Sequence, residues 1–144
     1  MRKKLTDEYI RGLVEGEGTF TFTTSPRGFN KKVKIPSFQL RMYIRDKKLI
    51  ELVRDFFGLK NKVYTYFYPG KDGANRGPQA MLIVREIGNL KNIIIPFFYN
   101  NLVGYKVKQF EEWLEKIGTD PAVSEGFKII YRLHKSGWFL KKKH

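Results

Sequence analysis

Apolar residues near the N-terminal end recur at helical spacing. Ile10, Leu13 and Val14 stand at positions i, i+3 and i+4, which places them on one face of a helix over about residues 7 to 15. Thr6 precedes this run, and its hydroxyl suits the N-cap of such a helix. The sequence therefore predicts an amphipathic helix here.

Farther along, apolar and polar residues alternate with a period of two, which is the spacing of a β-strand. The clearest case is Thr-Phe-Thr-Phe-Thr-Thr, in which Phe20 and Phe22 face the core and the threonines face outward. Pro36 has no N–H for a strand ladder, so we expect it to start a strand rather than lie inside one. Four strands are predicted, at about residues 19–24, 37–43, 61–68 and 79–85.

Helical spacing returns between and after these strands. Asp46 and Asn89 are expected to cap the N-termini of two helices. Pro96 is expected to mark a break after the helix that Asn89 caps, and Gly137 to end the last helix. The predicted helices cover about residues 47–57, 89–95, 105–117 and 124–135. The order is α-β-β-α-β-β-α-α-α without an internal repeat. We therefore expect one domain over residues 1–144, of the α/β class with mixed (α+β) character.

The end of the first helix carries two carboxylates. Glu15 and Glu17 lie one residue apart, and each is followed by a glycine. The helix macrodipole makes an acid at a C-terminus unfavourable by up to ~1 kcal/mol, so a bound cation is the simplest compensation. Gly12 and Gly16 lie four residues apart on one face of the helix. Glycine inside a helix is destabilising, and the close approach of a second helix would explain why it is tolerated at these positions.

Composition indicates a folded protein with a polyanionic partner. The 144 residues include 12 Phe and 8 Tyr, which is enough for a packed core, and the net charge is +14. The chain has no Cys and only two His, which excludes disulfides, thiolate zinc sites and a nuclease built on clustered histidines. No apolar stretch reaches the ~20 residues of a membrane span, and no secretory peptide is visible. An intracellular protein that faces nucleic acid, not a membrane, is expected.

The positive charge is concentrated in the predicted strands and their loops. Between Gly18 and Arg45 there is no acid, and between Phe56 and Arg85 the only acid is Asp72. A surface that only aids solubility would mix both signs. The segregation therefore favours a binding surface.

The run Ile-Arg-Gly-Leu-Val-Glu-Gly-Glu-Gly, from Ile10 to Gly18, resembles the nine-residue signature of the LAGLIDADG homing endonucleases. Glu15 and Glu17 stand at its acidic positions. Further similar segments cover nearly the full length: Phe38-Gln39-Leu40 with Leu49 to Val53, Ile94 to Phe98 with Leu102 to Lys106, and Ser124 to Phe127. The resemblance implies the family's αββαββα core, whose four-stranded antiparallel sheet forms a saddle on duplex DNA.

The resemblance also implies a chemistry. It indicates an intron-encoded, site-specific endonuclease that makes an Mg²⁺-dependent double-strand cut across the minor groove and leaves 3′ overhangs. Mn²⁺ would substitute, and Ca²⁺ would support binding without cleavage. Glu17 is the expected metal ligand, with the carbonyl of Gly16 as a second, because a carboxylate-held ion stabilises charge and activates water. No small-molecule cofactor is expected.

Three further catalytic candidates follow from the same resemblance. Lys106 aligns with a lysine that the family places near the scissile phosphate, where it would stabilise negative charge. Family members often carry Gln in the second strand close to the metals, whereas this chain has Met42. Gln39 or Arg41, outward and nearby, would substitute for it.

One motif supplies one acidic helix end, although two strands must be cut. We therefore expect a homodimer with a pseudopalindromic target. Its interface would comprise Ile10, Gly12, Leu13, Glu15 and Gly16. Strand and loop side chains are expected to contact double-stranded DNA, some reading bases and others touching phosphates: Thr21, Thr23, Arg27, Lys34, Ser37, Gln39, Arg41, Lys62, Tyr64, Tyr66 and Arg85.

Other functions remain open at this point. A maturase that binds intron RNA, or a DNA-binding regulator on the same scaffold, would not need Glu15 and Glu17. A general basic RNA-binding protein would use exposed aromatic rings, which Tyr64 and Tyr66 permit, but it leaves the helix motif unexplained. Organelle-encoded members (mitochondrion or chloroplast) and bacterial cytoplasmic members both lack targeting peptides, so either location is expected.

Overall fold

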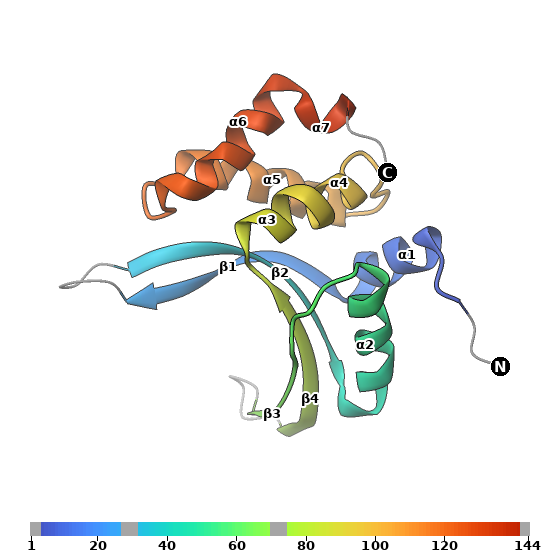
Figure 1. Ribbon diagram of the computed structural model, residues 1–144. Helices are drawn as coiled ribbons and strands as arrows, with labels where there is room; N and C mark the ends of the chain where they lie inside the picture. The colour runs from blue at the N-terminus through green and yellow to red at the C-terminus, as the bar shows by residue number, and fades with distance from the viewer. Residues whose placement is uncertain (1–3, 27–31, 70–74, 142–144) are drawn as a thin grey trace. The chain divides into compact units, whose positions relative to one another are not determined.

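The computed structural model describes residues 4–26, 32–69 and 75–141, and its elements follow the predicted order (Figure 1). The 3₁₀ turns are η1 and η3, and η2 is π-helical. In chain order the elements are α1 (Asp7–Glu17), β1 (Gly18–Pro26), β2 (Lys32–Tyr43), η1 (Ile44–Asp46), α2 (Lys47–Phe56), β3 (Val63–Pro69), β4 (Asn75–Val84), α3 (Ile87–Asn89), η2 (Leu90–Ile94), α4 (Ile95–Phe98), α5 (Lys106–Thr119), η3 (Glu125–Phe127), α6 (Lys128–Ser136) and α7 (Trp138–Lys141).

The predicted class is confirmed: the chain is mixed α/β with a four-stranded antiparallel sheet, in the order β1-β2-β4-β3. Two compact units divide the chain. The first comprises residues 1–19 and 39–83, and the second comprises residues 20–38 and 84–144. The prediction of one domain over the whole chain stays a prediction.

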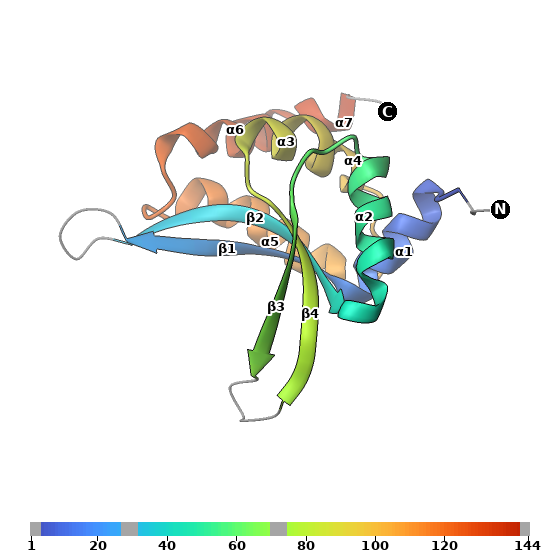
Figure 2. The ribbon, with the colours of Figure 1, turned by 60° about the horizontal axis from the view of Figure 1, so that its bottom comes forward.

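The first unit holds α1, α2 and the β3–β4 hairpin. In both ribbon views α1 and α2 lie side by side (Figures 1 and 2). Ile10 and Val14 of α1 and Ile50 and Val53 of α2 are fully buried, as their helical spacing predicts. The first helix thus packs through one apolar stripe and leaves its other faces outside this core.

The second unit is built around a cluster of aromatic rings. The Phe20 ring of β1 lies 4.8 Å from that of Phe110, 5.3 Å from Trp113, 5.4 Å from Phe38 and 5.6 Å from Phe98 between centroids. All five rings are at most 4% exposed. Tilted and edge-on ring pairs at such distances stabilise a core by more than the burial of their apolar area alone would. The cluster therefore fixes β1 and β2 to α4 and α5.

Pro36 lies inside β2, so the prediction that it starts the strand is wrong. The backbone N–H of Lys34 donates to the carbonyl of Ala122 at 3.0 Å, and only an isolated bridge joins Lys34 to Val123. Alternate residues of a strand point their N–H groups to the same edge, so the nitrogen of Pro36 faces this sparsely paired edge. The missing donor breaks no continuous ladder.

Pro96 does not break the helix, contrary to the prediction. The helix runs from Ile87 through η2 into α4. The N–H of Ile95 bonds to the carbonyl of Leu90, five residues earlier, which is a π-helical turn. This turn resets the hydrogen-bond register, so Pro96 falls in the first turn of α4, where its lack of an N–H is tolerated.

The predicted caps agree in part with the structure. Thr6 Oγ1 accepts a bond from the backbone N–H of Tyr9 at 3.1 Å, which confirms it as the N-cap of α1. Gly137 ends α6 with φ +81°, in the left-handed region that glycine favours. Asp46 stands at the N-cap position of α2 as predicted, although its side chain makes no cap bond. The helix predicted to begin after Asn89 begins at Ile87, so that cap prediction is wrong. The short helix α7 after Gly137 was not predicted.

Candidate metal centre and nucleic-acid interface

The position of Glu17 is fixed by the residue that follows it. Glu17 is the last residue of α1, and the N–H of Gly18 closes the helix by bonding to the carbonyl of Val14. A Cβ on Gly18 would lie 2.7 Å from Val14 Cγ1 and 3.1 Å from the Val14 Cα and carbonyl oxygen, so a larger residue does not fit. The side chain of Glu17 is exposed and that of Glu15 is half-buried. The second carboxylate of the motif therefore reaches solvent at a defined point.

These residues fit a divalent ion that is held together with a phosphate. In the described part of the chain, no group of three or more His, Asp or Glu side chains is placed to hold a metal alone. Mg²⁺ does not need such a cage, because it commonly binds one or two carboxylates, several waters and substrate phosphates. Glu17 offers an exposed carboxylate, and the carbonyl of Gly16 belongs to the last turn, where carbonyls lack intrahelical partners. The negative end of the α1 dipole further favours a cation.

One face of α1 is open. Gly12 and Gly16 are exposed, and a Cβ added to either would meet nothing within 4 Å among the described residues. Tyr9 lies on the same face at i−3 from Gly12 and is 49% exposed. Sequence reasoning missed Tyr9, although its helical spacing to both glycines marks the same face. Packing inside this chain does not explain why glycine stands at these two positions.

Ile10 does not belong to this open face, so its predicted place at an interface is wrong. Its side chain is 0% exposed, as is that of Val14, so the chain itself already encloses it. Leu13 and Glu15 are half-buried, so each retains surface that a second helix can reach. The open face therefore consists of Tyr9, Gly12, Leu13 and Gly16.

Several predicted DNA contacts come together on the sheet of the first unit. Arg41 of β2 donates from Nη1 to the hydroxyl of Tyr66 of β3 at 3.4 Å. The Lys62 ammonium lies 5.3 Å from the centroid of the Tyr64 ring, which is a cation–π distance. Arg41 and Lys62 are exposed, and Tyr64 is 47% exposed. We call Arg41, Lys62, Tyr64 and Tyr66 the aromatic–basic strip.

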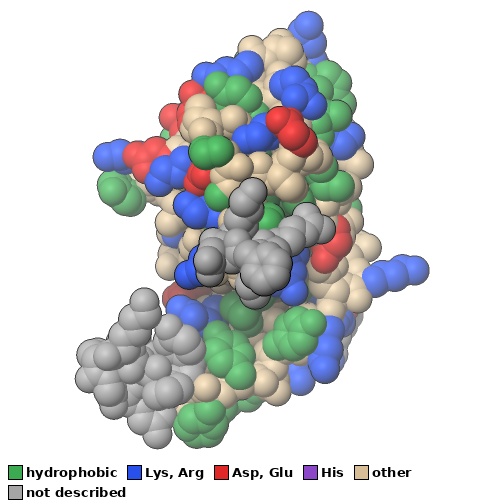
Figure 3. All heavy atoms as spheres, turned by 90° about the vertical axis from the view of Figure 1, so that its left-hand side faces the viewer, with side chains coloured by type: hydrophobic (Ala, Val, Ile, Leu, Met, Phe, Trp, Pro, Cys, Tyr) green, Lys and Arg blue, Asp and Glu red, His purple; other side chains and the backbone are tan. Residues whose placement is uncertain are grey.

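Strand β4 adds residues to this strip that sequence reasoning missed. Antiparallel pairing sets Gln79 opposite Tyr66 and Met81 opposite Tyr64, and the Tyr66 hydroxyl lies 3.9 Å from the Met81 sulfur. Buried Ala80 and Leu82 alternate with them, and this alternation was the available signal. Figure 3 shows basic and hydrophobic side chains next to one another on one face of the molecule. Gln39, two residues before Arg41, is half-buried.

The predicted contacts in the second unit are less uniform. Ser37 is 0% exposed, so the prediction that it faces outward is wrong, and we remove it from the candidate interface. Thr21 is half-buried, while the hydroxyl of Thr23 is buried without a hydrogen-bond partner. Arg85 is exposed but follows the end of β4 rather than lying in the strand. Arg27 lies outside the described residues.

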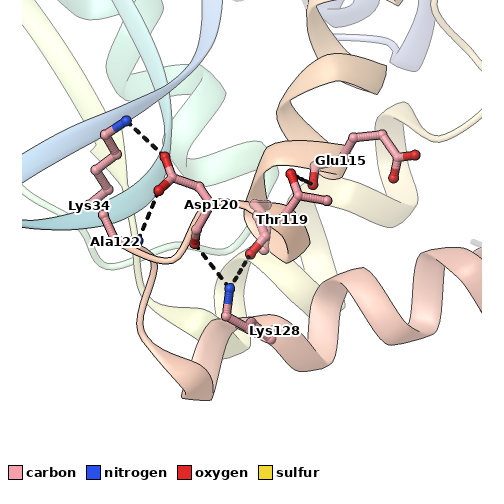
Figure 4. A network of polar contacts seen from close by, with 7 residues as sticks. Lys34, Glu115, Thr119, Asp120, Ala122 and Lys128 are labelled. Atoms are coloured by element: carbon pink, nitrogen blue, oxygen red, sulfur yellow. Dashed lines mark hydrogen bonds and ion pairs between the residues drawn. The ribbon is translucent and has the colours of Figure 1, made fainter.

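Lys34 has a partner within its own chain. Its ammonium lies 2.8 Å from Asp120 Oδ2, and the other oxygen of that carboxylate accepts from the N–H of Ala122 at 2.8 Å (Figure 4). The hydrogen bond from Lys34, followed by the one from Ala122, lowers the pKa of Asp120. Lys128 closes the same turn by donating to the carbonyls of Gly118 and Asp120, at 3.2 and 3.1 Å. The charge of Lys34 is thus shared with an acid of its own chain.

Lys106 is the first residue of α5, in the second unit, and is half-buried. Tyr105 and Val103, directly before it, are 83% and 90% exposed. Sequence reasoning did not single out these two residues, and no periodic signal marks them because they lie outside a regular element. Glu17, Gln39 and Arg41 belong to the first unit.

A cavity of about 280 Å³ lies in the second unit, and no predicted site residue lines it. Its wall includes Tyr99 and His134, whose hydroxyl and Nδ1 lie 2.6 Å apart. Burial is the largest cause that lowers the pKa of His134, and Lys135 lowers it further, whereas Glu115 and Glu111 raise it. A half-buried imidazole that is hydrogen-bonded to a tyrosine is typical of a structural contact.

The nine-residue motif from Ile10 to Gly18 and the four strands all fall within the match to one family model. The model described as LAGLIDADG endonuclease matches residues 10–117, which is most of the chain and includes both the α1 motif and α5. The chain belongs to the LAGLIDADG endonuclease family. The resemblance seen in the sequence is therefore confirmed.

Solved LAGLIDADG structures share the fold of this chain. The I-CpaMI meganuclease bound to uncleaved DNA is 22% identical to this chain with a TM-score of 0.65. The match covers 94% of this chain and 46% of the I-CpaMI chain. The I-LtrWI homing endonuclease bound to target DNA is 24% identical with a TM-score of 0.63, at 92% and 45% coverage. I-SmaMI bound to an uncleaved DNA target with calcium ions is 21% identical with a TM-score of 0.62, at 95% and 46% coverage.

The chain thus spans less than half the length of each of these three structures. A comparison with curated proteins found no match. Within the described ranges, no helix has both the length and the apolar character needed to cross a membrane.

Proposed function

We propose that this LAGLIDADG chain is a site-specific DNA endonuclease that makes an Mg²⁺-dependent double-strand cut. The observation that carries the proposal is the exposed carboxylate of Glu17, held at the end of α1 by a glycine that cannot be replaced without a clash. A protein that only binds nucleic acid does not need a solvent-facing acid at the negative end of a helix. The aromatic–basic strip supplies the matching surface for DNA.

Each candidate residue has a distinct part in the proposed reaction. When bound, Mg²⁺ would stabilise charge on the phosphate and lower the pKa of its water. Glu17 and the carbonyl of Gly16 hold the ion, and Lys106 stabilises the negative charge that develops on the phosphate. Gln39 or Arg41 orients water where Met42 offers no hydrogen-bond donor.

Sequence recognition is assigned to the strip and its neighbours on β4. A two-stranded ribbon fits the major groove, where Arg bonds to guanine and Gln to adenine, each worth about 1–3 kcal/mol of discrimination. Arg41 and Gln79 are the side chains of these types on the strip face. Lys62 is expected to contact phosphate, which adds salt-dependent affinity without sequence information.

Two DNA strands require two acidic helix ends, and this chain supplies one. We propose that a second copy of the chain packs against the open face of α1 to give a homodimer. The isologous contact then predicts a long pseudopalindromic target. Cleavage across the minor groove would leave 3′ overhangs.

The proposal is tested by selecting cut sites from a randomised double-stranded DNA library with Mg²⁺, with Mn²⁺, and with Ca²⁺ as control. We expect cleavage at related pseudopalindromic sites with Mg²⁺ or Mn²⁺, and binding without cleavage in Ca²⁺. If no duplex is cut with either metal while structured intron RNA is bound, the chain is a maturase instead. If selected duplexes are bound but never cut, it is a DNA-binding regulator on the same scaffold.

A further inference from the structure

Two side chains of α5 form hydrogen bonds with the backbone of β1. The amide oxygen of Gln109 accepts a bond from the N–H of Phe20 at 2.9 Å, and the indole N–H of Trp113 donates to the carbonyl of Thr21 at 2.7 Å. Gln109 and Trp113 are four residues apart, so they project from one face of the helix. Both bonds are partly buried, and all four residues belong to the second unit.

Together these contacts fix α5 in both rotation and translation. A slip of one residue along an α-helix moves its side chains by about 1.5 Å and turns them by about 100°, which would break both bonds. The Phe20 ring packs against both Phe110 and Trp113, with centroids 4.8 and 5.3 Å away. The polar bonds thus set the exact register of a contact that apolar packing alone leaves adjustable.

Lys106 shares the helix face that is held in this way. It lies three residues before Gln109, which is one turn, at the first position of α5. We propose that Gln109, supported by Trp113, is a positioning residue: it holds the first turn of α5 on β1 and so sets where the Lys106 ammonium stands relative to the β1 backbone around Thr21. This inference rests on the proposed function, since it assigns Lys106 to the cleavage step.

The proposed role is sensitive to small displacements. Misplacing a catalytic group by about 1 Å costs on the order of 100-fold in rate. Gln109 is half-buried rather than part of the aromatic core, so its replacement by a residue of similar shape leaves that core in place. Loss of its amide oxygen should therefore affect cleavage far more than folding or DNA binding.

The experiment compares Gln109→Met, which keeps the shape but removes the acceptor, with Gln109→Glu, which keeps an acceptor oxygen. Glu112→Gln, exposed on the same helix, is the matched control. Single-turnover cleavage is measured with Mg²⁺, DNA affinity with Ca²⁺, and the thermal midpoint by circular dichroism. We expect Gln109→Met to cut about 10- to 100-fold more slowly at unchanged affinity, with only a small decrease in midpoint from the unpaired N–H of Phe20. Gln109→Glu and Glu112→Gln should cut like the parent protein.

A double variant tests whether Gln109 acts through Lys106. If it does, adding Gln109→Met to Lys106→Met should slow cleavage no further, because the group being positioned is already absent. Multiplied effects in the double variant, or parent-like cleavage by Gln109→Met, would overturn the inference while leaving the endonuclease intact. So would a loss of affinity or midpoint that matches the loss of rate. A parent protein that cuts no selected duplex would instead overturn the proposed function itself.

Discussion

Glycines at single positions of α1 serve two different purposes. Gly18 is required inside the chain, because a Cβ would press against the backbone and side chain of Val14. Gly12 and Gly16 are not required inside the described chain, because nothing lies within 4 Å of an added Cβ. The first glycine therefore places Glu17, and the other two are available for contact with another helix.

Replacing Gly18 by alanine should destabilise the protein. The methyl group would lie 2.7 Å from Val14 Cγ1 and 3.1 Å from Val14 backbone atoms, and backbone gives way less easily than a flexible side chain. We expect the free energy of unfolding to fall by about 1–3 kcal/mol, the usual cost of overpacking. Gly88→Ala, an exposed site with open space, is the control in chemical denaturation. Equal stabilities of the two variants would show that α1 shifts to accept the methyl group.

Glu17→Gln should abolish cleavage and preserve DNA binding. The amide keeps the size of the side chain but not the charge that holds the ion, and loss of metal assistance removes several kcal/mol of transition-state stabilisation. The expected decrease in single-turnover rate is about 1000-fold or more, with affinity in Ca²⁺ unchanged. Glu8→Gln, exposed in the first turn of α1, should behave like the parent. Persistent Mg²⁺-dependent cutting by Glu17→Gln would remove Glu17 from the mechanism.

The two wrong predictions of site residues, Ser37 and Ile10, share one physical origin. Alternation placed Ser37 outward, but Pro36, Ser37 and Phe38 are all buried, so β2 is covered on both faces at this point. Ile10 was assigned to an interface because it belongs to the motif, yet its own core encloses it. Periodicity reports which residues share a face. It does not report what covers that face.

Elements whose patterns are local were predictable, and those that depend on distant partners were not. The helical stripes of α1 and α5 were found because their spacing is complete within the sequence. The start of β2 was missed because it depends on a backbone bond between Lys34 and Ala122, far apart in the chain. The continuity through Pro96 depends on the π-turn η2, for which no sequence signal was recognised.

The crossing of α5 and α6 offers a test at this scale. A Cβ on Gly118 would lie 2.0 Å from the Tyr131 ring, so glycine allows the aromatic ring of α6 to rest on α5. Gly118→Ala should lower the free energy of unfolding by about 1–3 kcal/mol, or more if the ring cannot move. Gly126→Ala, where a Cβ meets nothing within 4 Å, is the control. A stability of Gly118→Ala equal to that of the control would contradict this packing.

The contact between α6 and the segment after α4 should respond to acid. Burial lowers the pKa of His134, so the folded protein binds this proton at lower pH than the unfolded chain does. His134 therefore contributes stability above the unfolded pKa of about 6.5, and this contribution decreases as the pH falls from there toward the folded pKa. We expect the thermal midpoint to decrease from pH 7 to pH 5, and His134→Gln to reduce that slope. Identical slopes in both proteins would exclude His134 as the source.

On the scale of the whole molecule, the separation of charge is the feature that sequence reasoning captured best. Exposed basic side chains of the first unit line β2 and β3 beside tyrosines, as the acid-free stretches indicated. The geometry of the proposed double-strand cut was beyond the sequence, because such a cut needs two acidic helix ends and this chain supplies one. The proposed site would therefore depend on assembly as much as on folding.

Assembly through α1 is tested by Gly12→Leu. Gly12 is exposed with no atom within 4 Å of an added Cβ, so the monomer should fold normally, and leucine is a better helix former than glycine. In a dimer the same side chain would hold two helices apart, because close crossing requires small residues at the contact. We expect sedimentation to show monomers of Gly12→Leu at concentrations where the parent protein is dimeric.

The control for that variant is Asp7→Leu, which adds an equally large apolar side chain at an exposed position of α1 on the side opposite the two glycines. It should sediment as the parent does. Monomeric Gly12→Leu should also lose double-strand cleavage, since each monomer carries one Glu17. A dimer of unchanged mass would show that the glycine face is not the interface. Double-strand cleavage by a proven monomer would show instead that one acidic helix end is enough.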